Sequence, residues 1–160
     1  MSRAASHVVP PFQDLIEANR ATVYRFLSVA VGPNDVDDCF QETFLAALRA
    51  YPGVSDGERL DRWVLKIASR KAIDHHRAAG RRAIPSEDPP ERAVHDDPHV
   101  PDDPLWAAVR SLPPRQRVAV VHRHVLDRSY EDIALLMDCT QETARANVYQ
   151  GTKRLRELMA

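Results

Sequence analysis

The chain of 160 residues lacks most of the motifs on which enzymes and redox proteins depend. Its two cysteines, Cys39 and Cys139, do not form a CxxC pair, so we interpret them as reduced, small apolar side chains. There is no glycine-rich phosphate loop, no nucleophile elbow and no HExxH motif, so an enzyme has no visible active site. We therefore predict no catalytic residues, no metal ligands and no cofactor.

Long apolar runs are also missing. No segment approaches the length needed to cross a bilayer, and the N-terminal MSRAASHVVPP lacks the apolar core of a signal peptide. We expect a cytoplasmic protein that does not insert into a membrane. Hydrophobic residues nevertheless make up 44% of the chain, which is enough for a folded core.

The net charge of -1 argues against a nucleic-acid partner until its distribution is considered. Residues 83–104 contain seven acidic residues, one arginine and six prolines, with almost no apolar periodicity. Their net charge is -6, so the rest of the chain sums to +5. Such a segment cannot offset the entropy of ordering by burial, and we predict a flexible acidic linker between two helical domains.

Three helices are predicted before the linker. Apolar residues recur at helical spacing over 12–31, where Gly32-Pro33 ends the pattern, and Asn34 or Asp35 can cap a second helix that ends before Tyr51. The second helix carries apolar Leu45 and Leu48. Its other face presents acidic and amide groups, either as a solvated surface or as a contact for a partner, from Asp37, Asp38, Gln41 and Glu42.

The third predicted helix begins at Asp61 and has a basic polar side with an aromatic residue, Trp63, near its start. Positive charge tracks phosphates and aromatic faces stack on unpaired bases, so this helix suits single-stranded or melted DNA. A solvated basic helix is the alternative. The basic residues are Arg62, Lys66, Arg70, Lys71, Arg77, Arg81 and Arg82.

Four helices are predicted after the linker, and the last two form a helix-turn-helix over Ser129–Leu158. Ser129 can cap the first of these two, Asp138 and Cys139 interrupt it, and Thr140 can cap the second. Ala144, Val148, Gly151, Leu155 and Leu158 form the inner face of that second helix, and its outward side would meet the major groove of DNA. Ordinary packing of two amphipathic helices is the alternative. The outward residues are Gln141, Arg145, Ala146, Tyr149 and Gln150.

Together these features resemble the extracytoplasmic-function (ECF) sigma factors of bacterial RNA polymerase. DVDDCFQETFLAALRAY is similar to their polymerase-binding helix, RWVLKIASRKAIDHHR to their promoter-melting helix, and the sequence from Leu112 to Leu158 to their region 4. The resemblance implies an all-α fold of two small helical domains. These are region 2, a bundle of three to four helices at 12–82, and region 4, a four-helix domain with the helix-turn-helix at 105–160, joined by the linker 83–104.

The resemblance also implies a function without catalysis. An alternative sigma factor binds RNA polymerase core, at the beta-prime clamp and the beta flap, reads the -35 duplex, and melts and captures the -10 strand. An anti-sigma factor is a further expected partner. The implied residues are, for the -35 element, Arg123, Tyr130, Glu131, Gln141, Arg145, Ala146, Tyr149, Gln150 and Lys153; for the -10 element, Val54, Trp63, Lys66, Arg70, Lys71 and Arg77; and for polymerase, Asp38, Gln41, Glu42 and Phe44.

The sequence departs from the family pattern at two places. Many relatives carry Asn where this chain has Arg70, so the base preference at the -10 element is not carried over. Relatives commonly have a run of Arg and Ser in the recognition helix, where this chain has Ala146, Asn147, Gln150 and Thr152. Fewer charges predict weaker and less salt-dependent -35 binding, or a reading that depends on Asn147 and Gln150.

Two other functions are compatible with parts of the sequence. A stand-alone regulator could bind an operator through the helix-turn-helix and dimerise through the N-terminal helices, with a two-fold symmetric footprint. A redox or metal sensor could use Cys39, Cys139 and the histidines. The adjacent His75 and His76 cannot face one ligand from a helix, and His122 and His124 point to different faces, so a metal site is disfavoured.

Overall fold

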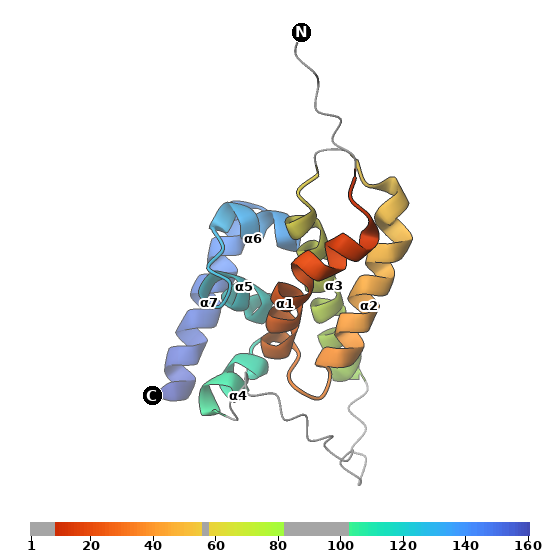
Figure 1. The fold of residues 1–160 in the computed structure, drawn as a ribbon. Helices are drawn as coiled ribbons and strands as arrows, with labels where there is room; N and C mark the ends of the chain where they lie inside the picture. Colours follow the sequence, from red (N-terminus) through yellow and green to blue (C-terminus); the bar gives the residue numbers. More distant parts are fainter. Residues whose placement is uncertain (1–8, 56–57, 82–102) are drawn as a thin grey trace.

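The computed structural model describes residues 9–55, 58–81 and 103–160, apart from the side chains of 76–81. Within these ranges the chain is all-α, as predicted. Two groups of helices lie side by side, with the first three to the right of Figure 1 and most of the last four to the left. The elements are α1 (Phe12–Ala30), α2 (Val36–Ala50), the short 3-10 helix η1 (Tyr51–Gly53), α3 (Leu60–Arg81), α4 (Pro104–Ser111), α5 (Pro114–His124), α6 (Tyr130–Met137) and α7 (Gln141–Met159).

The ends of α1 and α2 follow local backbone chemistry. Gly32 has φ +88°, a conformation that side chains rarely adopt, and it turns the chain directly after α1. The predicted cap of α2 is wrong in detail: Asp35 is the N-cap residue, but its side chain accepts no capping hydrogen bond. Asp35 instead lies 3.3 Å from His75 Nε2 of α3, so its carboxylate ties the first helices together.

The helix-turn-helix forms as its caps predict. Ser129 Oγ accepts from the backbone N–H of Asp132 at 3.1 Å, and Thr140 Oγ1 accepts from the N–H of Thr143 at 3.1 Å. Asp138, with φ +55°, ends α6 in the left-handed region. These three residues set the bounds of α6 and the start of α7.

A close crossing of α5 and α7 supports this motif. A Cβ added at Gly151 would lie 2.5 Å from Val120 Cγ2, which no packed structure tolerates without a shift. Ala144 and Val148 continue the same buried face, as predicted. Leu158 continues the same apolar side of α7 but is 56% exposed, because α7 extends beyond the helices that cover its first half.

The two helical groups share one continuous hydrophobic core, which the sequence did not indicate. The core cluster runs from Phe26 and Leu65 of the first group to Val118, Val121 and Ile133 of the second. Arg117 of α5 reaches across the boundary and donates to Ala30 O at 3.1 Å, at the C-terminal end of α1. The predicted linker 83–104 lies almost wholly outside the described residues, since only its last two residues are described.

Candidate nucleic-acid interface

The first half of α7 presents the predicted -35 residues to solvent. Gln141, Arg145, Ala146 and Gln150 are exposed, and Tyr149 is 67% exposed. The face is exposed because the opposite side of α7, with Ala144, Val148 and Gly151, is buried against α5 and α6. Further along α7, Lys153 is also exposed.

Tyr130, the first residue of α6, connects this face to α5. The guanidinium carbon of Arg123 lies 4.4 Å from the centroid of the Tyr130 ring, and that of Arg145 lies 5.1 Å from it. Arg123 also donates to Arg128 O at 3.1 Å. Three predicted residues from three helices therefore form one cationic cluster around an aromatic ring, and such contacts orient the guanidinium groups. Glu131, beside Tyr130, is exposed.

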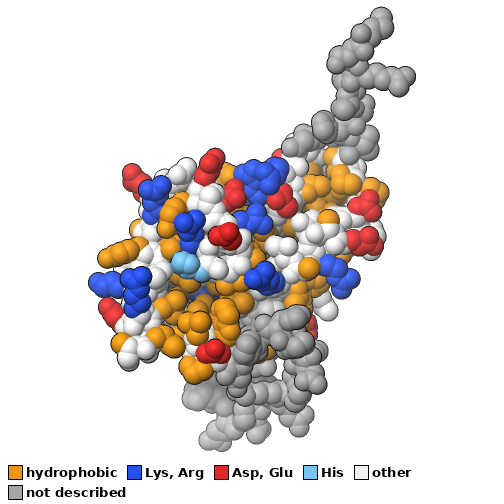
Figure 2. Space-filling model, turned by 60° about the vertical axis from the view of Figure 1, so that its left-hand side comes forward, with side chains coloured by type: hydrophobic (Ala, Val, Ile, Leu, Met, Phe, Trp, Pro, Cys, Tyr) orange, Lys and Arg blue, Asp and Glu red, His pale blue; other side chains and the backbone are white. Residues whose placement is uncertain are grey.

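The side chain of Asn147 is less available to contact a base than the sequence predicted. Its side-chain amide donates to Thr143 O at 3.1 Å, one turn back along α7. Figure 2 shows the molecule with the side of α5, α6 and α7 turned forward, and arginine and lysine side chains are spread over this face among acidic and apolar ones. Positive charge is thus distributed rather than concentrated in one block.

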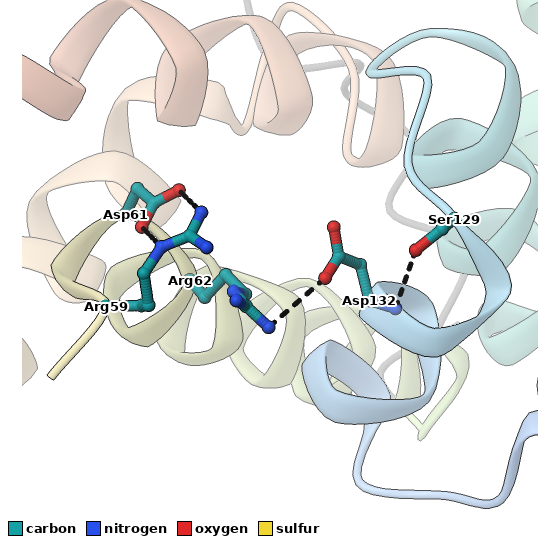
Figure 3. A network of polar contacts seen from close by, with 5 residues as sticks. All are labelled: Arg59, Asp61, Arg62, Ser129 and Asp132. Atoms are coloured by element: carbon teal, nitrogen blue, oxygen red, sulfur yellow. Dashed lines mark hydrogen bonds and ion pairs between the residues drawn. The ribbon is translucent and has the colours of Figure 1, made fainter.

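The basic side of α3 lies against α6 and pairs with its carboxylates, although Arg70 remains exposed. Arg62 lies 3.3 Å from Asp132 of α6, and both Lys66 and Arg70 approach Asp138 at 4.0 and 3.6 Å. Figure 3 shows Arg62 pointing from α3 toward Asp132, whose backbone N–H is bound by Ser129 Oγ.

A groove of about 450 Å³ lies along this contact between α3 and α6. Trp63, Lys66 and Arg70 line one wall, and Leu135 and Leu136 of α6 line the other. At one end, Arg59 binds Asp61 with two hydrogen bonds of 3.1 and 3.0 Å, and this contact lowers the pKa of Asp61. The groove has the volume to admit a nucleobase.

The remaining predicted -10 residues are less exposed or not described. Trp63 is half-buried, with its ring centroid 6.1 Å from that of Tyr51. Val54 and Lys71 are also half-buried, and the side chain of Arg77 lies outside the described residues. Among the -10 residues whose side chains are described, only Arg70 is exposed.

The outer face of α2 exposes three of the four predicted polymerase-binding residues, Asp38, Gln41 and Glu42. Phe44 is 8% exposed and packs against Phe40, so it supports this face from within. The sequence did not indicate that two apolar side chains of α2 would be exposed beside this face. Leu45 and Leu48 are each 51% exposed, beside an apolar groove of about 380 Å³ that Phe12 and Ile16 complete.

Comparison with known proteins identifies the two helical groups. Sigma-70 region 2 matches residues 15–82, which include nearly all of α1 to α3, and Sigma-70, region 4 matches residues 102–155. The two matches cover most of the chain. The chain belongs to the sigma-70 family.

Relatives place this sigma factor among the ECF sigma factors. It is 30% identical to RNA polymerase sigma factor CarQ of Myxococcus xanthus, over 99% of this chain and 95% of that protein. It is also 30% identical to ECF RNA polymerase sigma factor SigE of Mycolicibacterium smegmatis over 95% of this chain, which spans 63% of the length of SigE. The chain is an alternative sigma factor that directs initiation of transcription at promoters.

Solved structures confirm the fold. The sigma factor RpoE of Bartonella quintana, determined with the anti-sigma factor NepR, has a TM-score of 0.71 at 21% identity, covering 92% of this chain and 96% of RpoE. CnrH, determined with the cytosolic domain of CnrY, has a TM-score of 0.65 at 17% identity, covering 92% of this chain and 86% of CnrH.

The cysteines of this sigma factor do not form a redox pair in the structure. Both are free, and Cys39 is buried in the core. Burial and the carboxylates of Glu42, Asp35 and Asp38 raise the pKa of the Cys39 thiol to about 12, so it stays protonated near neutral pH. No group of three or more potential metal ligands comes together among the described residues, and none of the described helices has the length and apolarity to cross a bilayer.

Proposed function

We propose that this sigma factor divides promoter recognition between its two helical groups. In this division, α7 reads the -35 duplex, α3 melts and captures the -10 strand, and α2 docks on RNA polymerase core. The proposed domains are region 2 at 12–82, the acidic linker at 83–104 and region 4 at 105–160. The matched ranges of the two sigma-70 regions support this division.

The observation that carries the proposal for the -35 element is the exposed outer face of α7. Gln141, Arg145 and Gln150 can reach base edges in the major groove, where amide and guanidinium groups make paired hydrogen bonds. The Arg123–Tyr130 contact supports a role in binding the adjacent phosphates, with Glu131, Ala146, Tyr149 and Lys153 completing the surface.

The proposal for the -10 element rests on charge and on the groove beside α3. Lys66 and Arg70 supply positive charge for the phosphates of a separated strand, and Trp63 supplies an aromatic face. Unstacking a base costs a few kcal/mol, which its capture in a pocket must offset. We assign Val54, Lys71 and Arg77 to the same surface.

For RNA polymerase core, we propose a mixed surface on α2. Asp38, Gln41 and Glu42 would meet basic and polar groups of the beta-prime clamp, and the half-exposed Leu45 and Leu48 would bury apolar area beside them. Region 4 would contact the beta flap. In this account the polymerase performs the catalysis, the sigma factor has no enzymatic site or cofactor, and the protein acts in the cytoplasm.

An anti-sigma factor is the remaining proposed partner. A groove of about 910 Å³ runs between α1 and α2 on one side and, on the other, Trp106 of α4 and Val125 directly after α5. Its apolar wall is flanked by Arg20 and Arg25, which favours an amphipathic helix with acidic residues along its edge. Such a helix would contact both regions at once.

Promoter opening tests the division of labour. Holoenzyme carrying Arg145→Ala should transcribe a duplex promoter poorly and a pre-melted template nearly normally, because -35 binding acts before opening. Holoenzyme carrying Arg70→Ala should bind the duplex but show weaker permanganate reactivity of -10 thymines, or a changed base preference there. Equal losses on both templates for Arg145→Ala, or unchanged opening and base preference for Arg70→Ala, would contradict the assignments.

A further inference from the structure

The basic residues of α3 that face α6 form a single stripe. Arg62, Lys66 and Arg70 are spaced four residues apart, which places them one above another on a helix. Each has a carboxylate of the helix-turn-helix as its partner. The distances are 3.3 Å from Arg62 to Asp132, and 4.0 and 3.6 Å from Lys66 and Arg70 to Asp138.

The backbone positions of Asp132 and Asp138 are fixed at the two ends of α6. The N–H of Asp132 is bound by the Ser129 cap, and Asp138 ends the helix in the left-handed conformation with its N–H directed to Ala134 O and Leu135 O. The two residues therefore lie at opposite ends of a short helix, about 9 Å apart along its axis. They present a pair of negative charges to the stripe on α3.

We propose that α6 occupies the strand-binding face of α3 in the free sigma factor, so that Asp132 and Asp138 take the place of promoter phosphates. This inference rests on the proposed assignment of α3 to the -10 strand. Promoter DNA and the chain's own carboxylates compete for the same three cations. Only molecules in which the two regions have separated can bind single-stranded DNA through α3. The apparent affinity of the free chain is therefore lower than that of an uncovered α3, by a factor equal to the separated fraction.

The interior of the contact explains why the closed arrangement persists without a partner. His122 of α5 is fully buried, and its Nε2 lies 2.8 Å from Ser69 Oγ of α3. Ser69 donates its only hydroxyl proton to Leu65 O, so we assign the proton of His122 to Nε2, which donates to Ser69 Oγ. This buried hydrogen bond and the shared core hold the regions together, while the outer ion pairs are solvent-accessible and adjustable.

The test removes the two carboxylates and leaves the stripe intact. Asp132→Asn with Asp138→Asn keeps the size of both side chains, and asparagine tolerates the left-handed backbone of Asp138. The matched control is Asp127→Asn with Glu157→Gln, which removes two charges from other exposed positions. Asp127 also has a positive φ, of 54°, so the control reproduces the backbone setting as well.

Opening is measured by thiol modification of the full-length chain. Ser69→Cys places a thiol at the buried contact, in a background with Cys139→Ser, and buried Cys39 reports unfolding of the α1 to α3 group. We expect the thiol introduced by Ser69→Cys to react about three- to tenfold faster in the double Asn variant, with Cys39 unchanged. In the same background, Asp132→Arg as a single further change should also speed the reaction. Combining it with Arg62→Asp restores an opposite-charge pair and should slow the reaction again.

DNA binding is measured without polymerase, by fluorescence anisotropy with a labelled 15-nucleotide single strand of mixed sequence. The double Asn variant should bind severalfold more tightly than the wild type, and the control variant should bind like the wild type. Unchanged thiol reactivity would overturn the inference, as would an equal gain in affinity for the control. Faster thiol reaction without a gain in DNA affinity would also overturn it. In that case, promoter opening by the Arg70→Ala holoenzyme tests separately whether α3 binds the -10 strand.

Discussion

His122 of α5 stacks on Phe26 of α1, with ring centroids 4.5 Å apart and planes inclined by 4°. The two residues come from regions 4 and 2, so this contact lies at the centre of the closed molecule. None of the histidine surface reaches solvent. A polar ring in this position makes the stability of the closed form depend on the protonation of one side chain.

The first prediction concerns pH. Burial, with Arg128 nearby, lowers the pKa of His122 to about 3, from an ordinary value of 6.5. Between these values the unfolded chain binds a proton that the folded chain excludes, so stability is fully present above pH 6.5 and falls as pH decreases. Urea unfolding should show a loss on the order of 2 kcal/mol from this group between pH 7 and 5. His122→Gln should remove that part of the pH dependence, and an identical slope in both proteins would contradict the burial of a neutral ring.

The second prediction concerns the crossing of α5 and α7. Gly151→Ala should destabilise the protein by about 1–3 kcal/mol, because the new methyl group would overlap Val120. Val120→Ala in the same chain should recover part of the loss. Gly53→Ala is the control, since no atom lies within 4 Å of its added Cβ. Thermal unfolding of the four proteins measures this, and equal effects of the two glycine substitutions would disprove the close crossing.

The third prediction concerns the ring that joins Arg123 to Arg145. Tyr130→Leu keeps apolar bulk but removes both cation–π contacts, each worth about 0.5–1 kcal/mol at an exposed site. Promoter binding by holoenzyme should weaken about three- to tenfold on duplex DNA. Arg156→Ala, at the far end of α7, should have little effect. If both variants bind alike, the cluster does not position these arginines for DNA.

The sequence predicted the helices of region 4 correctly, but it did not predict which other helices they contact. Ser129 and Thr140 carry their signal locally, because a hydroxyl caps the turn that follows it, and both caps form as predicted. The contacts of Asp132 and Asp138 with α3 join residues more than 60 positions apart. Neither periodicity nor charge counting contains such pairings, so the sequence predicted a DNA contact or a solvated face for the basic stripe and gave no sign of its partners on α6.

The exposed leucines of α2 show a second limit. Leu45 and Leu48 have the spacing of core residues, yet both are half-exposed. The apolar side of α2 is wider than the surface that α1 and α3 cover. Leu158, near the end of α7, is exposed for a similar reason. Pattern alone identifies which residues are apolar, whereas their burial depends on which helices reach them.

The fourth prediction uses that uncovered stripe. Asp38→Arg with Gln41→Ala should weaken binding to core polymerase by tenfold or more, and Leu48→Asp should have a similar effect by placing a charge in the apolar part of the contact. Glu157→Arg, an exposed charge reversal on α7, is the control. Affinity for core polymerase can be measured by competition with a labelled sigma factor. Unchanged affinity of the α2 variants would mean that this face is simply solvated.

The most direct measurement is run-off transcription on fragmented genomic DNA by purified bacterial core polymerase, with and without this sigma factor. We predict new discrete transcripts that appear only when the protein is added and that are lost with Asp38→Arg and Gln41→Ala. Their start sites would define both promoter elements. An absence of transcripts, together with sequence-specific binding of duplex DNA by the protein alone and a two-fold symmetric footprint, would contradict the account and favour an operator-binding regulator.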